Sequence, residues 1–323
     1  MTVPELRAEI EARPGDPAVT RRFERVRRDV IYDEIAASCA IAGAKLTPLA
    51  VRRLLERGST VAGNLADHLL VLGYARAALE IARERPVRGA ARRLITVPEI
   101  ERLHITITSP MDVANARATP QAAWRRANLP PVREGMVTTP HWLIEFEMAA
   151  LVDRIGGGPP RESALFAWLA DAYERLERIR PFVDANGRVA RLVVNLLLSR
   201  LGFPPATISH ALLESYRHAL RTADAGDRSG LADVLERAVR ANLERLSAAI
   251  VDADALKPLA SFAGRELSLD ALRKAAHRGR LRTVARGREI YSTRAWVQAY
   301  RTGKSRAGRP PHKPGARTIS SRE

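Results

Sequence analysis

The sequence predicts an all-α fold, in which a bundle of packed helices is followed by a small basic domain. The chain has 323 residues, which is enough for one sizeable core and a smaller domain. Hydrophobic residues make up 46% of the chain but aromatic residues only 5%, so the core is expected to consist mainly of Ala, Leu, Val and Ile. Apolar residues also recur at helical spacing over long segments. Together these observations favour packed helices.

Residues 1–95 are expected to form N-terminal helices. Thr47 and Pro48 are an N-cap followed by a proline at the first helical position, a pair that marks a helix start. Apolar spacing and such start signals predict helices over residues 3–12, 17–40, 48–58 and 64–83.

Residues 96–250 are expected to hold the main core. The stretch Ser109–Val137 contains prolines and lacks a clear periodicity, so it is predicted to be irregular. Helices are predicted over residues 97–104, 140–153, 161–178, 188–201, 206–223 and 229–250.

The polar turn Arg180–Arg191 separates two of these helices and is the candidate functional site. A helix N-terminus presents unpaired N–H groups and the positive end of the helix dipole, and Gly187 lets a ligand approach them. Arg188 and Arg191 are three residues apart on one helical face, where both can reach one anion. Asp184 is a hard oxygen ligand suited to Mg²⁺ beside a phosphate. The turn therefore predicts a polyphosphate site with a metal; a helix hairpin with a solvated arginine turn is the alternative.

The same turn resembles the signature of the Fic (Fido) family, His-Pro-Phe-x-(Asp/Glu)-Gly-Asn-Gly-Arg-x-x-Arg. The sequence meets this pattern except at Ala185, which stands for a Gly, and Arg180, which stands for the His. The resemblance covers most of residues 20–250. It implies a Fic-type helical bundle that transfers a nucleotide, usually AMP from ATP, onto a hydroxyl group of a target protein.

The resemblance also implies roles for individual residues. Asp184 would hold Mg²⁺, and the phosphates of ATP or another nucleotide would be held by Asn186, Gly187, Arg188 and Arg191. The family's His is the general base, but Arg180 cannot take a proton because its guanidinium stays charged. A general base typically contributes about 10²–10⁴-fold to the rate. Nucleotide binding is therefore expected to survive better than transfer, and two functions stay open: an adenylyltransferase with impaired or altered activity, and a pseudoenzyme that senses a nucleotide and regulates transcription.

Segment 37–47 is similar to the inhibitory helix of many Fic proteins, whose pattern is Ser/Thr-x-x-x-Glu-Gly/Asn. Ser38 and Gly43 match the pattern, whereas Ala42 stands at the Glu position. In the family that Glu pairs with the second motif arginine, so Arg191 is expected to be free here. A helix that simply ends at the glycine is the alternative.

Histidines outside the motif could replace the missing base only if the fold brought them to the turn. His104 and His141 are the candidates, although a packing or surface role is the simpler interpretation of each.

The C-terminal end is strongly basic. Residues 256–323 hold 17 Lys and Arg against 4 Asp and Glu, in a chain whose formal net charge is +17. Helices are predicted over residues 256–264, 268–277 and 294–301, with a hairpin over residues 281–291 before the last of them. This order over residues 256–302 is that of a winged helix-turn-helix domain, and residues 272–281 resemble the recognition helix and wing of excisionase or MerR-like domains. A charge excess confined to one end favours a polyanionic partner, here DNA.

Basic side chains on such a helix and wing bind phosphates and enter the major groove. The candidate DNA contacts are Arg273, Lys274, Arg278, Arg282, Arg286 and Arg288. A solvated basic face and a winged helix that docks protein are the alternatives. Residues 303–323 are rich in Pro, Gly and basic residues and are expected to be a disordered basic tail.

Several other classes of protein are excluded. Cys39 is the single cysteine, which rules out an internal disulfide and a multi-cysteine zinc site. The chain begins without a secretory signal pattern, and no apolar run approaches the about 18 residues of a transmembrane helix. We therefore expect a cytoplasmic protein without a membrane partner.

Overall fold

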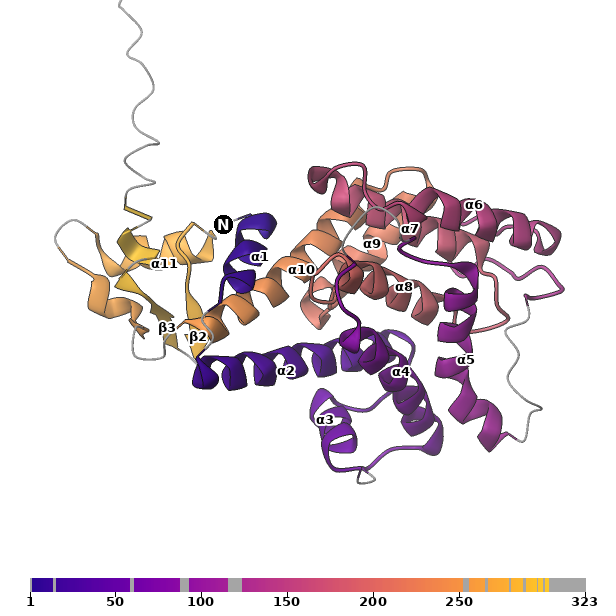
Figure 1. The fold of residues 1–323 in the computed structure, drawn as a ribbon, viewed down its shortest axis with the longest axis horizontal. Coiled ribbons are helices and arrows are strands. Elements are labelled where there is room, and N and C mark those ends of the chain that lie inside the picture. The colour runs from indigo at the N-terminus through magenta and orange to yellow at the C-terminus, as the bar shows by residue number, and fades with distance from the viewer. Residues whose placement is uncertain are drawn as a thin grey trace, which may run out of the picture. The chain divides into compact units, whose positions relative to one another are not determined.

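The computed structural model divides into two compact units, Met1–Ile250 and Val251–Glu323 (Figure 1). The structure describes residues 2–13, 16–58, 61–87, 93–115, 124–251, 256–264, 267–278, 280–286, 289–294, 296–298 and 300–301. Arg288 and the predicted tail 303–323 lie outside the described residues.

The first unit is built from helices, so the predicted all-α fold is confirmed. Its α-helices are α1 (Val3–Glu11), α2 (Pro17–Ile41), α3 (Pro48–Arg57), α4 (Leu65–Arg83), α5 (Val97–Ala114), α6 (Ile144–Gly156), α7 (Leu165–Ile179), α8 (Asn186–Arg200), α9 (Leu213–Asp224) and α10 (Ser229–Ile250). Short 3₁₀ helices precede three of them, η1 (His141–Leu143), η2 (Glu162–Ala164) and η3 (His210–Leu212).

Helix ends follow the local signals in the sequence. The Thr47 side chain accepts a hydrogen bond from the backbone N–H of Ala50 at 3.2 Å, and Pro48 opens α3. Gly58 ends that helix in the left-handed conformation, with φ 61°. The boundaries of α3 are therefore set by capping chemistry.

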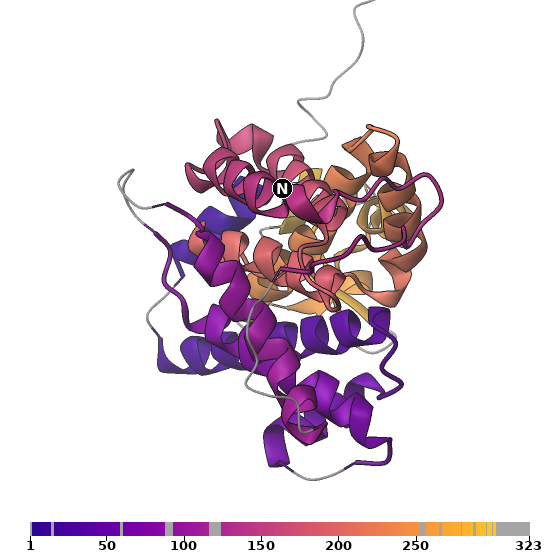
Figure 2. The same cartoon turned by 90° about the vertical axis from the view of Figure 1, so that its right-hand side faces the viewer.

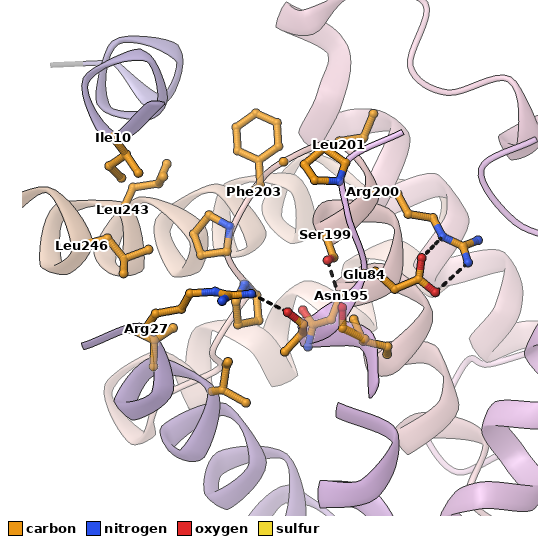
Figure 3. Close-up of a pocket in the computed structure, with 18 of the residues that line it drawn as sticks. Ile10, Arg27, Glu84, Asn195, Ser199, Arg200, Leu201, Phe203, Leu243 and Leu246 are labelled. Carbon is orange, nitrogen blue, oxygen red and sulfur yellow. Dashed lines mark hydrogen bonds and ion pairs between the residues drawn. The ribbon is translucent and has the colours of Figure 1, made fainter. Parts of the chain in front are cut away.

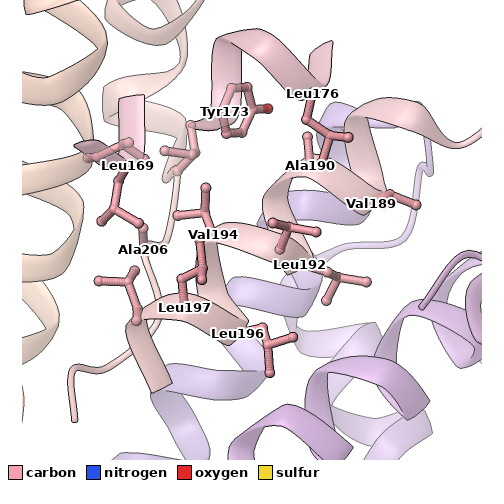
Figure 4. Close-up of a cluster of buried hydrophobic side chains, with 14 of the residues drawn as sticks. Leu169, Tyr173, Leu176, Val189, Ala190, Leu192, Val194, Leu196, Leu197 and Ala206 are labelled. Atoms are coloured by element: carbon pink, nitrogen blue, oxygen red, sulfur yellow. The ribbon is translucent and has the colours of Figure 1, made fainter. Parts of the chain in front are cut away.

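Helix α8 lies at the centre of the first unit. It packs against α2, α4, α5 and α7, and Figures 1 and 2 show it enclosed by its neighbours. Most of its side chains are buried, as expected for a helix that is apolar on several faces. Figure 4 shows Val189, Leu192 and Leu197 of α8 packed in one aliphatic cluster with Leu169 and Tyr173 of α7. The turn before α8 is thus attached to a helix that is buried in the core.

Helix α5 is longer than predicted, because it continues beyond residue 104 to Ala114 and includes Pro110. It packs tightly on α4: a Cβ atom on Gly73 would lie 2.3 Å from the carbonyl oxygen of Ile107. Packing against α4 therefore maintains a helix that the proline alone would have disfavoured.

The second unit contains strands β1 (Lys257–Pro258), β2 (Val284–Arg286) and β3 (Glu289–Ser292), the 3₁₀ helix η5 (Leu259–Phe262) and α11 (Leu269–His277). The strands form an antiparallel sheet in the order β1-β3-β2, in which Lys257 is opposite Ser292 and Val284 is opposite Tyr291. The unit has its own small core, made of Leu259, Leu267, Leu272, Ala275, Leu281 and Val297.

The prediction of a helix over residues 256–264 was wrong. Residues 257–258 pair with β3, and only one 3₁₀ turn follows. Pro258 explains the difference, because a proline disfavours helical geometry in the residue before it. The predicted helix 268–277 and the hairpin that follows it are present.

No described helix combines the length and apolarity needed to cross a membrane.

Candidate functional site

The turn between α7 and α8 has an unusual backbone. Arg180, the C-cap of α7, has φ 45°, and Ala185, which precedes α8, has φ 66°. Both are non-glycine residues in the left-handed region, where an L side chain costs about 1–2 kcal/mol. Such strain often accompanies functional sites. The positive φ of Ala185 also explains why the Fic signature has a glycine at that position, since glycine adopts this conformation without strain.

Asn186 closes this turn on itself. Its Oδ1 accepts a hydrogen bond from the backbone N–H of Phe182 at 3.0 Å, and its Nδ2 donates to the Phe182 carbonyl at 2.7 Å. The side chain is 5% exposed. Asn186 therefore shapes the turn, and its side-chain amide is already bonded within it.

Gly187 lies in the first turn of α8, where backbone N–H groups lack partners within the helix. A Cβ atom there would lie 3.2 Å from Oε1 of Glu177 and 3.5 Å from a terminal guanidinium nitrogen of Arg191. The glycine thus makes room for two buried charged side chains as well as for a ligand. Arg133 donates to Glu177 at 2.8 Å and to Asp224 at 2.8 Å, which holds the Glu177 carboxylate in place.

Asp184 and Arg188 form an ion pair at the start of α8, in which the carboxylate faces solvent and the Arg188 side chain is only 12% exposed. A terminal nitrogen of Arg188 donates to Oδ2 of Asp184 at 3.2 Å, and the Asp184 side chain is 85% exposed. Burial lowers the pKa of Arg188, and the Asp184 charge opposes that shift. An exposed carboxylate beside a helix N-terminus fits Mg²⁺, which usually takes one or two carboxylates and completes its shell with phosphates and water. In the described part of the chain, no three His, Cys, Asp or Glu side chains gather into a metal site of their own.

Arg180 brings a cation to the turn without an acidic partner. Among the described residues, no carboxylate lies within ion-pair distance of its guanidinium, and its Nε is buried without a hydrogen-bond acceptor. Its charge also adds to burial in lowering the pKa of Arg125. The turn therefore carries an uncompensated positive charge, which suits an anionic ligand.

Arg125 anchors the turn and was not identified from the sequence. Its Nε donates to the Arg180 carbonyl at 2.7 Å, and its terminal nitrogens donate to the carbonyls of Ala127, Thr139 and Ile179. The guanidinium therefore binds the carbonyls that α7 leaves unpaired at its C-terminus. No local signal marks this residue, since its acceptors are backbone carbonyls and three of the four are distant in the sequence.

Arg191 is not free, so that expectation was wrong. Its Nε donates to Oγ of Ser38 at 2.5 Å, and a terminal nitrogen donates to the Ser38 carbonyl at 3.0 Å. The residue is 7% exposed and cannot share an exposed anion with Arg188 in this arrangement. Burial opposes its charge, but the hydroxyls of Tyr216, Tyr173 and Tyr74 raise the pKa of Arg191 above its usual value. The segment 37–47 thus contacts the motif through Ser38, although Ala42 only caps α2.

Glu34, one helical turn before Ser38, is a second acid near Arg191 that the sequence did not reveal. It is 3% exposed and accepts a hydrogen bond from the Tyr74 hydroxyl at 2.7 Å. Burial raises the pKa of Glu34 to about 7, against the effects of Tyr74 and the Arg191 charge.

This shift predicts a loss of stability as the pH rises. The folded state holds the Glu34 proton up to about pH 7, whereas the unfolded chain releases it near the ordinary value of 4.5. The stabilisation is full below pH 4.5 and is lost as the pH rises through about 7, with an upper limit of about 3 kcal/mol. Urea unfolding of Glu34→Gln should therefore show a flatter pH profile than the natural chain. Glu24→Gln is the control, since Glu24 lies on the same helix and its side chain is 50% exposed. Parallel profiles for the natural chain and Glu34→Gln would contradict the shift.

His104 is the histidine that the fold brings to the turn. Its ring stacks on Phe182, with centroids 3.8 Å apart and planes 6° apart, and Trp124 lies on the same phenyl ring at 5.4 Å. Burial lowers the pKa of His104 to about 4, so its imidazole is neutral at neutral pH. His141 instead contacts Asn128 through its ring nitrogen at 3.2 Å. His104 therefore supports the Phe182 side of the turn.

Comparison with known proteins places this geometry in a family. Residues 94–198 match the Fic/DOC family. The chain is 28% identical over 212 residues to the protein adenylyltransferase Fic of Drosophila virilis, which covers 64% of this chain and 40% of that protein. It is 27% identical over 212 residues to the protein of the same name from Nematostella vectensis, covering 65% and 47%. The matched region is less than half the length of these relatives.

Two solved structures share the fold. Fic-1 of C. elegans (residues 134–508) superposes with a TM-score of 0.61 at 23% identity, covering 76% of this chain and 70% of that one. A Fic family protein from Desulfovibrio desulfuricans G20 has a TM-score of 0.54 at 18% identity, covering 87% and 97%. The turn, its strained backbone and the Asp184–Arg188 pair all lie within the matched region. Residues 94–198 therefore match the Fic/DOC family, and the fold around them is shared with these two solved structures.

Proposed function

We propose that the turn Arg180–Asn186 and the first turn of α8 bind the polyphosphate of ATP or another nucleotide together with Mg²⁺. One observation carries the proposal: Asp184 and Arg188 are 3.2 Å apart at a helix N-terminus, beside an Arg180 guanidinium without an acidic partner in the described residues. A cation, a helix dipole and an exposed carboxylate together complement a metal-bound polyphosphate.

The exposed and the buried residues of the turn would have different roles. Asp184 would hold Mg²⁺, while Arg188 and the N–H of Gly187 would contact phosphate oxygens. Arg191 would take part only after exchanging its contacts with Ser38. A hydroxyl oxygen of a target protein would attack the α-phosphorus of ATP, so that AMP is transferred, pyrophosphate leaves and the hydroxyl proton passes to solvent. The relatives named protein adenylyltransferase support this class of reaction.

Transfer is proposed to be slow in this chain, because the position of the family's general base is Arg180. A protonated guanidinium cannot accept the hydroxyl proton but can hold a phosphate. His104 is neutral and close to the turn, yet it is packed flat on Phe182. We propose an adenylyltransferase of reduced or altered activity that retains nucleotide binding.

Replacing Arg188 with Ala tests the nucleotide site. Hydrogen bonds to charged groups contribute about 1.5–3 kcal/mol, so Arg188→Ala should weaken ATP binding by about 10- to 100-fold in the presence of Mg²⁺. Isothermal titration of the full chain measures this effect. Asp184→Asn should remove most of the gain in affinity from Mg²⁺. Arg217→Ala is the control, because Arg217, like Arg188, pairs with a carboxylate a few residues before it, here Glu214 at 2.7 Å. Equal affinity of Arg188→Ala and the natural chain would refute the site.

Binding of DNA by the second unit is a second candidate function, which would make the chain a nucleotide-sensing regulator. We infer it from the exposed basic side chains of Arg273 and Arg278, on and after α11, next to the hairpin of β2 and β3. This order is compatible with a winged helix-turn-helix. Lys274 is exposed but pairs with Asp270 at 2.9 Å, and Arg282 stacks on Trp296 at 3.9 Å, so these two offer less to a phosphate. The side chain of Arg286 lies outside the described residues.

A salt titration tests this function. Arg273→Ala should reduce DNA affinity and lower the dependence of log K on log salt by about one, since each phosphate contact releases about one counterion. Fluorescence anisotropy with a labelled duplex from the chain's own promoter measures both quantities. An affinity and a salt slope that match those of Arg217→Ala would count against DNA binding through α11.

A further inference from the structure

A large cavity lies in the first unit and is separate from the turn. Its volume is about 760 Å³, and it is lined by residues of α1, α2, α4, α8 and α10 and of the loop that follows α8. None of the turn residues 180–188 lines it. Pockets that bind drug-sized molecules have volumes of about 300–1,000 Å³. The space is therefore sufficient for a small-molecule ligand.

The inner wall of the cavity is largely apolar. Figure 3 shows Ile10, Leu243 and Leu246 gathered on one side, with Phe203 and Leu201 of the loop after α8 across from them. Val30 and Ile81 complete this lining and are buried at 1% and 6% exposure. Such a wall favours an aliphatic or aromatic body over a polar one.

Three guanidinium groups lie along the more exposed part of the lining. Arg13 sits over the ring of Phe23 at 4.6 Å, and Arg7 sits over the ring of Phe203 at 4.8 Å. Arg27 of α2, labelled in Figure 3, also lines the cavity, and its guanidinium donates a hydrogen bond to the carbonyl of Ala82. Stacking on an aromatic ring holds the planar groups of Arg7 and Arg13 at the lining, and the bond to Ala82 holds that of Arg27, with donors left on each for a ligand.

The carboxylates near these arginines compete only weakly. Arg7 pairs with Glu11 at 2.9 Å and Arg27 pairs with Glu24 at 3.2 Å, and the two glutamates are 61% and 50% exposed. Exposed pairs of this kind contribute about 0–1 kcal/mol, so a ligand can replace them. In the described part of the chain, no carboxylate lies within ion-pair distance of Arg13; its guanidinium donates to the Ile10 carbonyl at 3.3 Å.

The other charged residues of the lining are already satisfied. Arg200 donates to Glu84 at 3.1 Å and to Glu99 at 2.7 Å, which leaves it no charge to offer. Glu34 is held by the Tyr74 hydroxyl at 2.7 Å. The positive character available to a ligand is therefore confined to Arg7, Arg13 and Arg27.

We propose that this cavity binds an amphipathic carboxylate, a long-chain fatty acid in its simplest form. Its apolar body would lie among Val30, Ile81 and the leucines of α10, and its carboxylate would contact Arg13 and Arg27. The cavity shares no lining residue with the turn 180–188 that is proposed to bind the nucleotide, and its ligand belongs to a different chemical class.

Titration of the full chain with a dansyl-labelled undecanoic acid tests the proposal. Saturable binding with one probe per chain and a blue shift of the emission is expected, because the dansyl group leaves water. The double substitution Arg13→Ala/Arg27→Ala should weaken binding at least about tenfold, through the loss of two charge-assisted hydrogen bonds. Unlabelled undecanoic acid should displace the probe at a concentration at least about tenfold lower than undecanol does, since only the acid carries the charge.

Two controls locate the site. Arg217→Ala removes a comparable exposed arginine on α9 and should leave the affinity unchanged. Ala78→Leu adds volume to the lining of the cavity and should abolish binding of the probe. If Ala78→Leu no longer unfolds cooperatively, the affinity of Arg13→Ala/Arg27→Ala alone decides whether the cavity binds the probe. The proposal is overturned if undecanoic acid and undecanol displace the probe equally well, or if the fluorescence signal does not saturate. It is also overturned if Arg217→Ala weakens probe binding as much as Arg13→Ala/Arg27→Ala does.

Discussion

The Arg180→His substitution is expected to raise AMP transfer to protein by about 10²–10⁴-fold, the usual contribution of a general base. Position 180 has φ 45°, and histidine is among the residues that adopt this region most readily. The backbone should also stay in place, because Arg125 holds the carbonyl of residue 180 at 2.7 Å. The new imidazole would therefore stand where the related pattern has its base.

Labelled ATP measures the gain, with the chain itself and added protein as acceptors. Arg180→Gln is the matched control, because it removes the charge without supplying a base and should leave transfer low. Adding Arg188→Ala to Arg180→His should abolish the gain, since the nucleotide would no longer be held. A chain that transfers no label after Arg180→His, while still binding ATP, would be a nucleotide-binding pseudoenzyme.

The sequence predicted those parts of the fold that depend on neighbouring residues. Thr47, Pro48 and Gly58 define α3 because capping and left-handed geometry act within one turn of the helix. The start of α8 after the turn was predictable for the same reason, but the prediction paired Arg188 with Arg191, whereas Arg188 contacts Asp184 four residues away. Short apolar segments were harder, as residues 257–262 show, because a strand there depends on pairing with β3.

The contacts of Arg191 could not be predicted from local pattern. Matching segment 37–47 to an inhibitory helix identified Ala42 as a lost acid and implied a free arginine. A buried guanidinium must nevertheless be hydrogen-bonded, and Ser38, far away in the sequence, supplies a hydroxyl and a carbonyl. Arg125 is a second case, because its acceptors are carbonyls, which every residue has. Which carbonyls meet it depends on the folded chain alone.

The largest expected effect on stability comes from Arg200, at the C-terminal end of α8. Its side chain is 2% exposed and donates to Glu84 at 3.1 Å, to Glu99 at 2.7 Å and to the Leu94 carbonyl at 2.7 Å. Arg200→Met keeps the apolar stem but removes the cation shared by both glutamates, which leaves Glu99 only the more distant Arg102 at 3.9 Å. Removing one partner of a buried ion pair typically costs about 3–5 kcal/mol, and we expect a loss of that size in urea unfolding at neutral pH. Arg217→Met is the control, since its exposed pair with Glu214 should cost less than about 1 kcal/mol.

The pH dependence of the same variant separates charge from packing. Burial opposes the ionised form of Glu99, but hydrogen bonds from Arg200 and Thr96 lower its pKa overall. A carboxylate with a lowered pKa stabilises the fold above its unfolded pKa and loses that contribution as the pH falls through its folded pKa. The difference in unfolding free energy between Arg200→Met and the natural chain should therefore narrow below pH 4.5, the ordinary pKa of Glu, as the carboxylates become neutral. A difference that stays constant down to pH 2 would show that Arg200 acts through its packed stem and its bond to Leu94. In that case Glu84→Gln and Glu99→Gln should not restore stability to Arg200→Met, whereas a charge-based role predicts that they do.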